Sequence, residues 1–96
     1  MEILSQDQYE YVKGFIVLHD DSETYIFHVS EIASIEIKKE GTPYKPYKAT
    51  VRIFGKAVAL IIAILIFPEA ETEKDFQAFL MCKMQMWAEK KERRNY

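Results

Sequence analysis

The chain has little of the residue types that build disulfide-stapled, glycine-looped or secreted proteins. Its 96 residues include one cysteine, three glycines and three prolines. Cys82 alone cannot form an internal disulfide, which is typical of proteins in a reducing compartment. The first residues also lack the basic start and apolar core of a signal peptide. These absences predict a cytoplasmic protein.

A strong excess of one charge is also absent. The formal net charge is −2, whereas duplex nucleic acid and anionic membranes are usually bound through many surplus lysines and arginines. We therefore expect neither a membrane nor duplex nucleic acid as a partner. The composition, 49% hydrophobic and 29% charged, is that of a chain that folds. At this length it should form a single domain over residues 1–96.

The longest apolar run covers residues 57–67 (AVALIIAILIF). It falls well short of the roughly 20 apolar residues that a membrane-spanning helix needs. Its β-branched residues, among them Val58, Ile61 and Ile62, favour a strand. Because both faces of this strand would be apolar, we expect it to lie in the centre of a sheet and to be covered on both sides.

Four further strands are predicted upstream of this run. Asp20 and Ser22 favour a turn between two apolar segments, which predicts a hairpin. Alternating apolar and polar residues over 34–38 predict a strand with one wet face, and a glycine with two prolines marks a loop from Gly41 to Tyr47. The four segments are 12–18, 25–29, 34–38 and 49–54. The chain should therefore form about five mostly antiparallel strands over residues 11–67, as a curved sheet or small barrel, after an N-terminal segment of residues 1–10.

Residues 70–93 have the pattern of one long amphipathic helix packed on this sheet. Phe76, Phe79, Leu80 and Trp87 recur at the spacing that places them on one face of a helix. The predicted fold class is therefore α+β, with the helix at the C-terminus.

One helix can cover only one face of the sheet. The other face could be closed by a barrel, by the N-terminal segment or by a second copy of the chain. We favour a second copy, in a homodimer or larger assembly, because methionines spread round the helix and methionine-rich surfaces adapt to partners; plain core filling explains these methionines equally well. The predicted oligomer contacts are Ile62, Ile64, Met81 and Met84.

No stretch has the spacing of a catalytic or cofactor site. His19 and His28 could meet Asp20 and Asp21 on the first hairpin, but their spacing does not require a metal. Cys82 has no histidine near it in the sequence, and the junction before the helix has no glycine for a phosphate cradle. We predict a protein that is not an enzyme and that binds no metal and no cofactor.

The stretch PYKPYK (residues 43–48) is the best candidate for a binding site. Its tyrosines offer rigid contact faces and its lysines offer charge, so Tyr44, Lys45, Tyr47, Lys48 and Arg52 are the predicted contact residues. The alternative is that the tyrosines pack back onto the body.

Two functions are compatible with this stretch. The first, which we favour, is a non-catalytic interaction protein that works as a homo-oligomer and binds another macromolecule, most simply a protein. The alternative is a binder of a small anionic ligand, such as a nucleotide, held between subunits. By class-level analogy alone, small acidic single-domain proteins of this kind resemble phage-encoded inhibitors of host systems.

Overall fold

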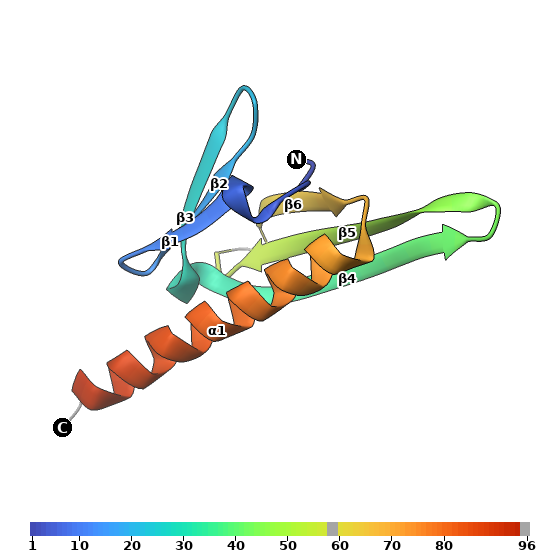
Figure 1. The fold of residues 1–96 in the computed structure, drawn as a ribbon. Helices are drawn as coiled ribbons and strands as arrows, with labels where there is room; N and C mark the ends of the chain where they lie inside the picture. The colour runs from blue at the N-terminus through green and yellow to red at the C-terminus, as the bar shows by residue number, and fades with distance from the viewer. Residues whose placement is uncertain (58–59, 95–96) are drawn as a thin grey trace.

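The computed structural model describes residues 1–57 and 60–94, and only the backbone of residues 92–94. It has two three-stranded antiparallel sheets and one C-terminal helix (Figure 1), which confirms the α+β class. The first sheet has the order β1 (Tyr9–Val12), β2 (Phe15–His19), β3 (Thr24–His28), and the second has the order β4 (Ile32–Thr42), β5 (Lys45–Gly55), β6 (Ile61–Phe67). The helix α1 covers Ala70–Arg94, and short 3-10 helices lie at Gln6–Gln8 (η1) and Val29–Glu31 (η2).

The described residues form six strands rather than five, in two sheets rather than one curved sheet or barrel. The additional strand is β1, because the apolar run 12–18 contains the end of β1, a turn and the start of β2. Lys13 and Gly14 make this turn with φ angles of 50° and 93°, the left-handed conformation that two-residue hairpins use. Gly14 is also required by space, since a Cβ there would lie 2.5 Å from Nε2 of His28.

The predicted hairpin at Asp20 is confirmed, since β2 pairs with β3 and the Asp20 N–H donates to the Glu23 carbonyl at 2.9 Å. The predicted loop from Gly41 to Tyr47 is wrong. β4 continues to Thr42 and β5 begins at Lys45. The prolines fit because Pro43 lies in the turn and Pro46 lies in a part of β5 that β6 does not reach, so its missing N–H costs the sheet no bond to β6.

The apolar run forms β6, which is an edge strand and not the predicted central one; Val58 and Ala59 of that run lie outside the described residues. Residues 1–3 run along its free side, where the Ile3 N–H donates to the Ile66 carbonyl at 2.8 Å and the Ile66 N–H donates to the Met1 carbonyl at 2.7 Å. One face of β6 is buried, but Ile64 on the other face is 45% exposed. The expectation that both faces are covered is therefore wrong.

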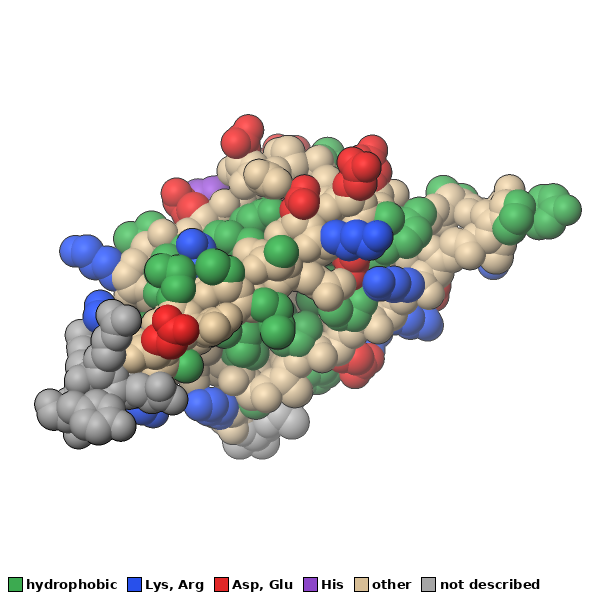
Figure 2. All heavy atoms as spheres, turned by 60° about the horizontal axis from the view of Figure 1, so that its bottom comes forward, with side chains coloured by type: hydrophobic (Ala, Val, Ile, Leu, Met, Phe, Trp, Pro, Cys, Tyr) green, Lys and Arg blue, Asp and Glu red, His purple; other side chains and the backbone are tan. Residues whose placement is uncertain are grey.

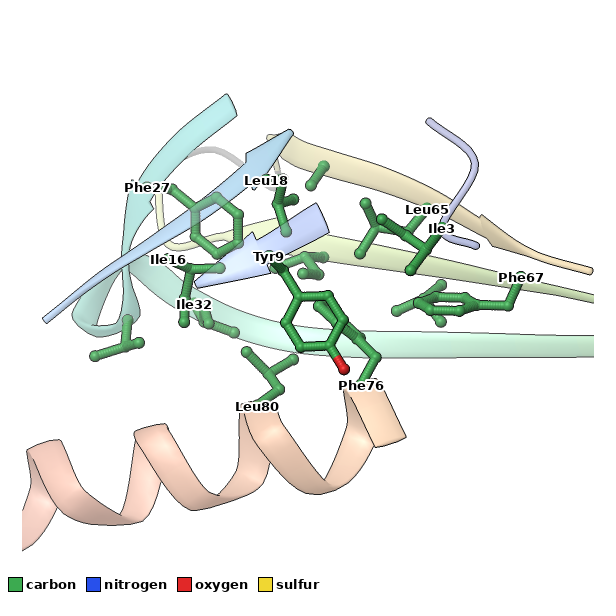
Figure 3. Packing of buried hydrophobic residues seen from close by; sticks show 14 of the residues in the cluster. Ile3, Tyr9, Ile16, Leu18, Phe27, Ile32, Leu65, Phe67, Phe76 and Leu80 are labelled. Carbon is green, nitrogen blue, oxygen red and sulfur yellow. The ribbon is translucent and has the colours of Figure 1, made fainter. Parts of the chain in front are cut away.

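The core lies between the two sheets and α1 (Figure 3). Ile16 and Leu18 enter it from the first sheet, Leu65 from the second, and Phe76 and Leu80 from the helix; all five are almost fully buried. The Tyr9 ring meets the Phe76 ring edge-on, with the centroids 5.1 Å apart. Over the described residues, no helix combines the length and apolar character that crossing a membrane requires.

Candidate functional site

The most prominent surface element is the end of the β4–β5 hairpin. Pairing between β5 and β6 stops at Ala49 and Phe67, so residues 40–48 form a ribbon of two strands, here called the arm. Figure 1 shows that the arm extends past β6 and past the start of α1. At its tip, Thr42 Oγ1 accepts hydrogen bonds from the N–H groups of Tyr44 (3.1 Å) and Lys45 (3.0 Å). These bonds hold the turn that presents Tyr44, which is 96% exposed.

The two tyrosines of the arm have different surroundings. Tyr47 is half-buried and packs against the core, and it lies close to Gly41, where a Cβ would come within 3.4 Å of the Tyr47 Cα. Tyr44 is held clear of the body at the tip. Only Tyr44 therefore offers its whole ring to another molecule.

The charged members of the predicted site lie along β5. Lys45 is next to the tip, Lys48 lies opposite Glu40, and Arg52 lies opposite Glu36 with 3.4 Å between Nη1 and Oε1. Four clefts on the described part of the chain are lined by other residues. The structure thus places the predicted contact residues in a strip along one strand and does not bring them together round one pocket.

Charge is divided between two regions of the chain. Residues 38–56 contain six lysines and arginines against one acid, Glu40, whereas residues 1–31 contain seven acids against one base, Lys13. The arm and its root are therefore basic, and the first sheet and its loops are acidic. Figure 2 shows the arm projecting from the body with hydrophobic side chains at its tip. Such separated charge produces a field that orients a charged partner during approach.

The predicted oligomer contacts do not form one surface. Ile64 is exposed and Ile62 half-buried on β6, and Ile64 lies on the face of the second sheet that points away from α1. Met81 is 65% exposed and lines a groove of about 130 Å³ between α1 and β4, beside Ile37, while Met84 packs against the core. Ile64 and Met81 thus lie on opposite sides of the sheet, and Ile62 packs against the core at an irregular point of β6.

The two histidines are in separate environments. His19 Nε2 lies 3.1 Å from Glu10 Oε1 at the surface. The His28 ring packs between Phe15 and Trp87, with centroid distances of 4.8 and 4.5 Å, and its Nδ1 accepts the Ser30 N–H. No cluster of three metal-ligating side chains is found in the described part of the chain. His28 thus connects the first sheet to the helix.

Two tyrosines outside the arm have altered acidity. A hydrogen bond to Glu23 raises the pKa of Tyr25. Burial raises the pKa of Tyr9, and the nearby charge of Asp75 adds to this effect. Both hydroxyls therefore stay protonated at neutral pH, and that of Tyr25 donates a hydrogen bond to Glu23.

Glu73 is a buried carboxylate that sequence reasoning missed. It is fully buried near the start of α1, where Oε1 accepts a hydrogen bond from Gln77 and lies 3.8 Å from Lys39 Nζ. Its Oε2 atom has no hydrogen-bond partner among the described residues. In the sequence Glu73 is one of several acids in the first turn of a helix, and this position usually indicates solvent and the helix dipole. The cation beside it, Lys39, comes from β4, which is distant in the sequence.

A second feature that sequence reasoning missed is the free side of β4. Among the described residues, β4 pairs only with β5, so its other edge is open. The alternation of Ile35, Glu36, Ile37 and Lys38 identifies the strand but not its position in the sheet.

Comparisons with protein-family models, with curated proteins and with solved structures find no match to this chain.

Proposed function

We propose that the protein is a non-catalytic interaction protein that works as a homo-oligomer and uses the arm to grip an acidic surface of another protein. The observation that carries this proposal is the arm itself, a ribbon of two strands that ends in a fully presented Tyr44. A two-stranded ribbon is only marginally stable in water. A chain that extends one beyond its body, with a tyrosine at the tip, presents a residue type that is enriched in protein contacts, and the lysines beside it add charge.

Charge supports the choice of partner. Lys45 and Lys48 are exposed on the arm, and Arg52 follows on the same strand. A basic arm on a protein of formal net charge −2 favours a partner with a local acidic patch. The strip-like placement of these residues suits a wide protein surface better than a small anion. Cytoplasmic location and an inhibitory role stay predictions.

Photo-crosslinking tests this proposal. A photoreactive phenylalanine analogue replaces Tyr44 in one variant and Ile26, which is 63% exposed on β3 in the acidic first sheet, in a matched control. After irradiation in the native cells we expect a defined protein adduct from position 44 and none from position 26. Because the grip depends on charge, the double substitution Lys45→Glu with Lys48→Glu should abolish the adduct.

Two results would contradict the proposal that the arm binds an acidic surface of a partner. Equal adducts from positions 44 and 26 would mean that the arm has no special role. An adduct at position 44 that survives both charge reversals would mean that the lysines do not hold the partner. A nuclease-sensitive adduct would replace the protein partner with a nucleic acid.

A further inference from the structure

The open edge of β4 carries a charge pattern that complements itself. Glu36, Ile37 and Lys38 follow one another in a regular stretch of β4, and their side chains are 57%, 36% and 68% exposed. An open strand edge is a template for pairing with another strand. If two copies of β4 pair antiparallel about Ile37, Glu36 faces the partner subunit's Lys38, and Lys38 faces the partner subunit's Glu36.

Neighbouring registers of the same pairing bring like charges together. A shift of the centre from Ile37 to Glu36 places two glutamates opposite each other, and a shift to Lys38 places two lysines opposite each other. Opposite charges across a pair of strands stabilise it, and like charges destabilise it by similar amounts. The pattern therefore selects one register, with Ile37 on the two-fold axis.

We infer that two copies of this chain associate through their β4 edges, antiparallel about Ile37, and form one continuous six-stranded sheet. The ion pairs that Glu36 and Lys38 form within each copy do not prevent this association. Glu36 lies 3.4 Å from Arg52, and Lys38 lies 3.2 Å from Glu40. Both are exposed pairs, which contribute little to stability, so their charges remain available to a second copy.

The same pairing of β4 edges would also stabilise the root of the arm. In this register residues 39–41 of one copy lie beside residues 33–35 of the other. The root of each arm, which is a two-stranded ribbon in one copy, then becomes part of a three-stranded sheet, and three strands are what independent stability requires. The tip with Tyr44 still projects beyond the partner.

The helix side of the dimer has an apolar seam. Ile37 points toward the groove between β4 and α1, which Ile35 and the exposed Met81 also line. Two such grooves meet at the axis when the edges pair, so both Ile37 side chains become buried. In the inferred dimer Met81 lies at the interface, whereas Ile62 and Ile64 lie away from it.

This inference rests on the part of the proposed function that makes the protein a homo-oligomer. It does not depend on the grip of the arm tip, so the two can fail separately. A monomeric protein overturns the β4 interface and leaves the crosslinking result at position 44 unaffected.

Charge reversal tests the register. Light scattering over a concentration series gives the dimer dissociation constant, and circular dichroism confirms that each variant is folded. Glu36→Lys and Lys38→Glu each replace two attractive pairs with two repulsive ones, so each should raise the dissociation constant about tenfold or more. An equal mixture of the two variants should form a heterodimer, and the double variant should again form a homodimer.

A matched pair of variants separates this interface from the outer face of the sheet. Ile37→Arg places two positive charges on the axis and should give a monomer. Ile64→Arg, at a residue of similar exposure on β6, should leave the dimer intact. The inference is overturned by a wild-type monomer, by a dimer that tolerates Ile37→Arg, by a dimer lost in Ile64→Arg, or by single charge variants that do not recover on mixing.

Discussion

β6 and β4 are the two edge strands of the second sheet, and they differ in charge and in how their free sides are covered. β6 has seven residues, none of them charged, and residues 1–3 form hydrogen bonds with Ile64 and Ile66 on its free side. β4 has eleven residues, among them Glu36, Lys38 and Lys39, and no described strand pairs with its free side. One edge is thus apolar and partly closed by the chain itself, and the other is charged and open.

The difference follows from what an exposed strand attracts. An open apolar edge pairs with any extended chain, so proteins cover such an edge or place charges on it. The N-terminal residues do the first for β6. On β4 the lysines and glutamates discourage pairing with unrelated strands, and in the dimer inferred above they match the complementary charges of a second β4. We therefore expect substitutions near β6 to act mainly on stability and substitutions on β4 to act mainly on association.

The largest expected difference is between Leu65 and Ile37. Both belong to the row that runs across the sheet through Val51, but Leu65 is 1% exposed and Ile37 is 36% exposed. Leu65→Ala should lower the free energy of unfolding by about 3 kcal/mol, because it leaves a cavity in the core. Ile37→Ala should cost about 1 kcal/mol or less in dilute solution. Urea unfolding measures both values.

Measuring the stability of both variants over a range of protein concentrations separates effects on folding from effects on association. If the β4 edges associate, wild-type stability rises with concentration, and the cost of Ile37→Ala rises with it. The cost of Leu65→Ala should show no such extra dependence. Equal losses for the two variants in dilute solution would mean that the open edge is as important to the fold as the covered one.

Substitutions at two neighbouring residues test whether residues 1–3 stabilise the free side of β6. Ile3 is fully buried beside β6, whereas the adjacent Leu4 is 60% exposed. Ile3→Ala should cost about 2 kcal/mol in urea unfolding, because it removes the side chain that anchors residues 1–3. Leu4→Ala is the control and should change stability by no more than about 0.5 kcal/mol. A negligible loss for Ile3→Ala would mean that residues 1–3 do not hold the β6 edge.

Local sequence patterns predicted which segments form strands and turns better than they predicted which strands lie side by side. The alternation over 34–38 and the turn at Asp20 both depend on residues close in sequence, and both predictions are confirmed. The turn at Lys13-Gly14 was missed although a glycine within an apolar run is a signal for it. Strand order could not be derived, because the pairing of Ile3 with Ile66 joins distant segments. The sequence prediction placed β6 at the centre of the sheet because both of its faces are apolar.

The candidate site shows the same division. PYKPYK is exposed at Tyr44 as its composition indicates, because the turn at Thr42 is set by local hydrogen bonds. The inward packing of Tyr47 depends on β4 and the core, which the local sequence does not describe. The sequence prediction assigned Ile64 to the interface because the second face of its strand needed a cover, and Met81 because methionines spread round the helix. Their positions on opposite sides of the sheet depend on the docking of α1.

A smaller effect is expected on the arm, where β4 and β5 leave the body. Tyr47→Ala should cost about 1 kcal/mol, because the ring packs against the core. Tyr44→Ala should cost no more than about 0.5 kcal/mol, because the ring is 96% exposed. Thermal and urea unfolding of both variants measure the difference. A larger loss at Tyr44 than at Tyr47 would show that the tip, rather than the root, stabilises the arm.

The smallest expected effect concerns the contact between Lys39 of β4 and the helix. Lys39 Nζ lies 3.8 Å from Oε1 of the buried Glu73, and the lysine side chain is 52% exposed. Lys39→Met should cost up to about 1 kcal/mol, because the buried carboxylate keeps only its bond to Gln77. In a Glu73→Gln background the same substitution should cost almost nothing, and this double-mutant cycle isolates the pair. If Lys39→Met costs the same in both backgrounds, Lys39 does not stabilise the buried carboxylate, and this charge of β4 then adds nothing to the docking of the helix.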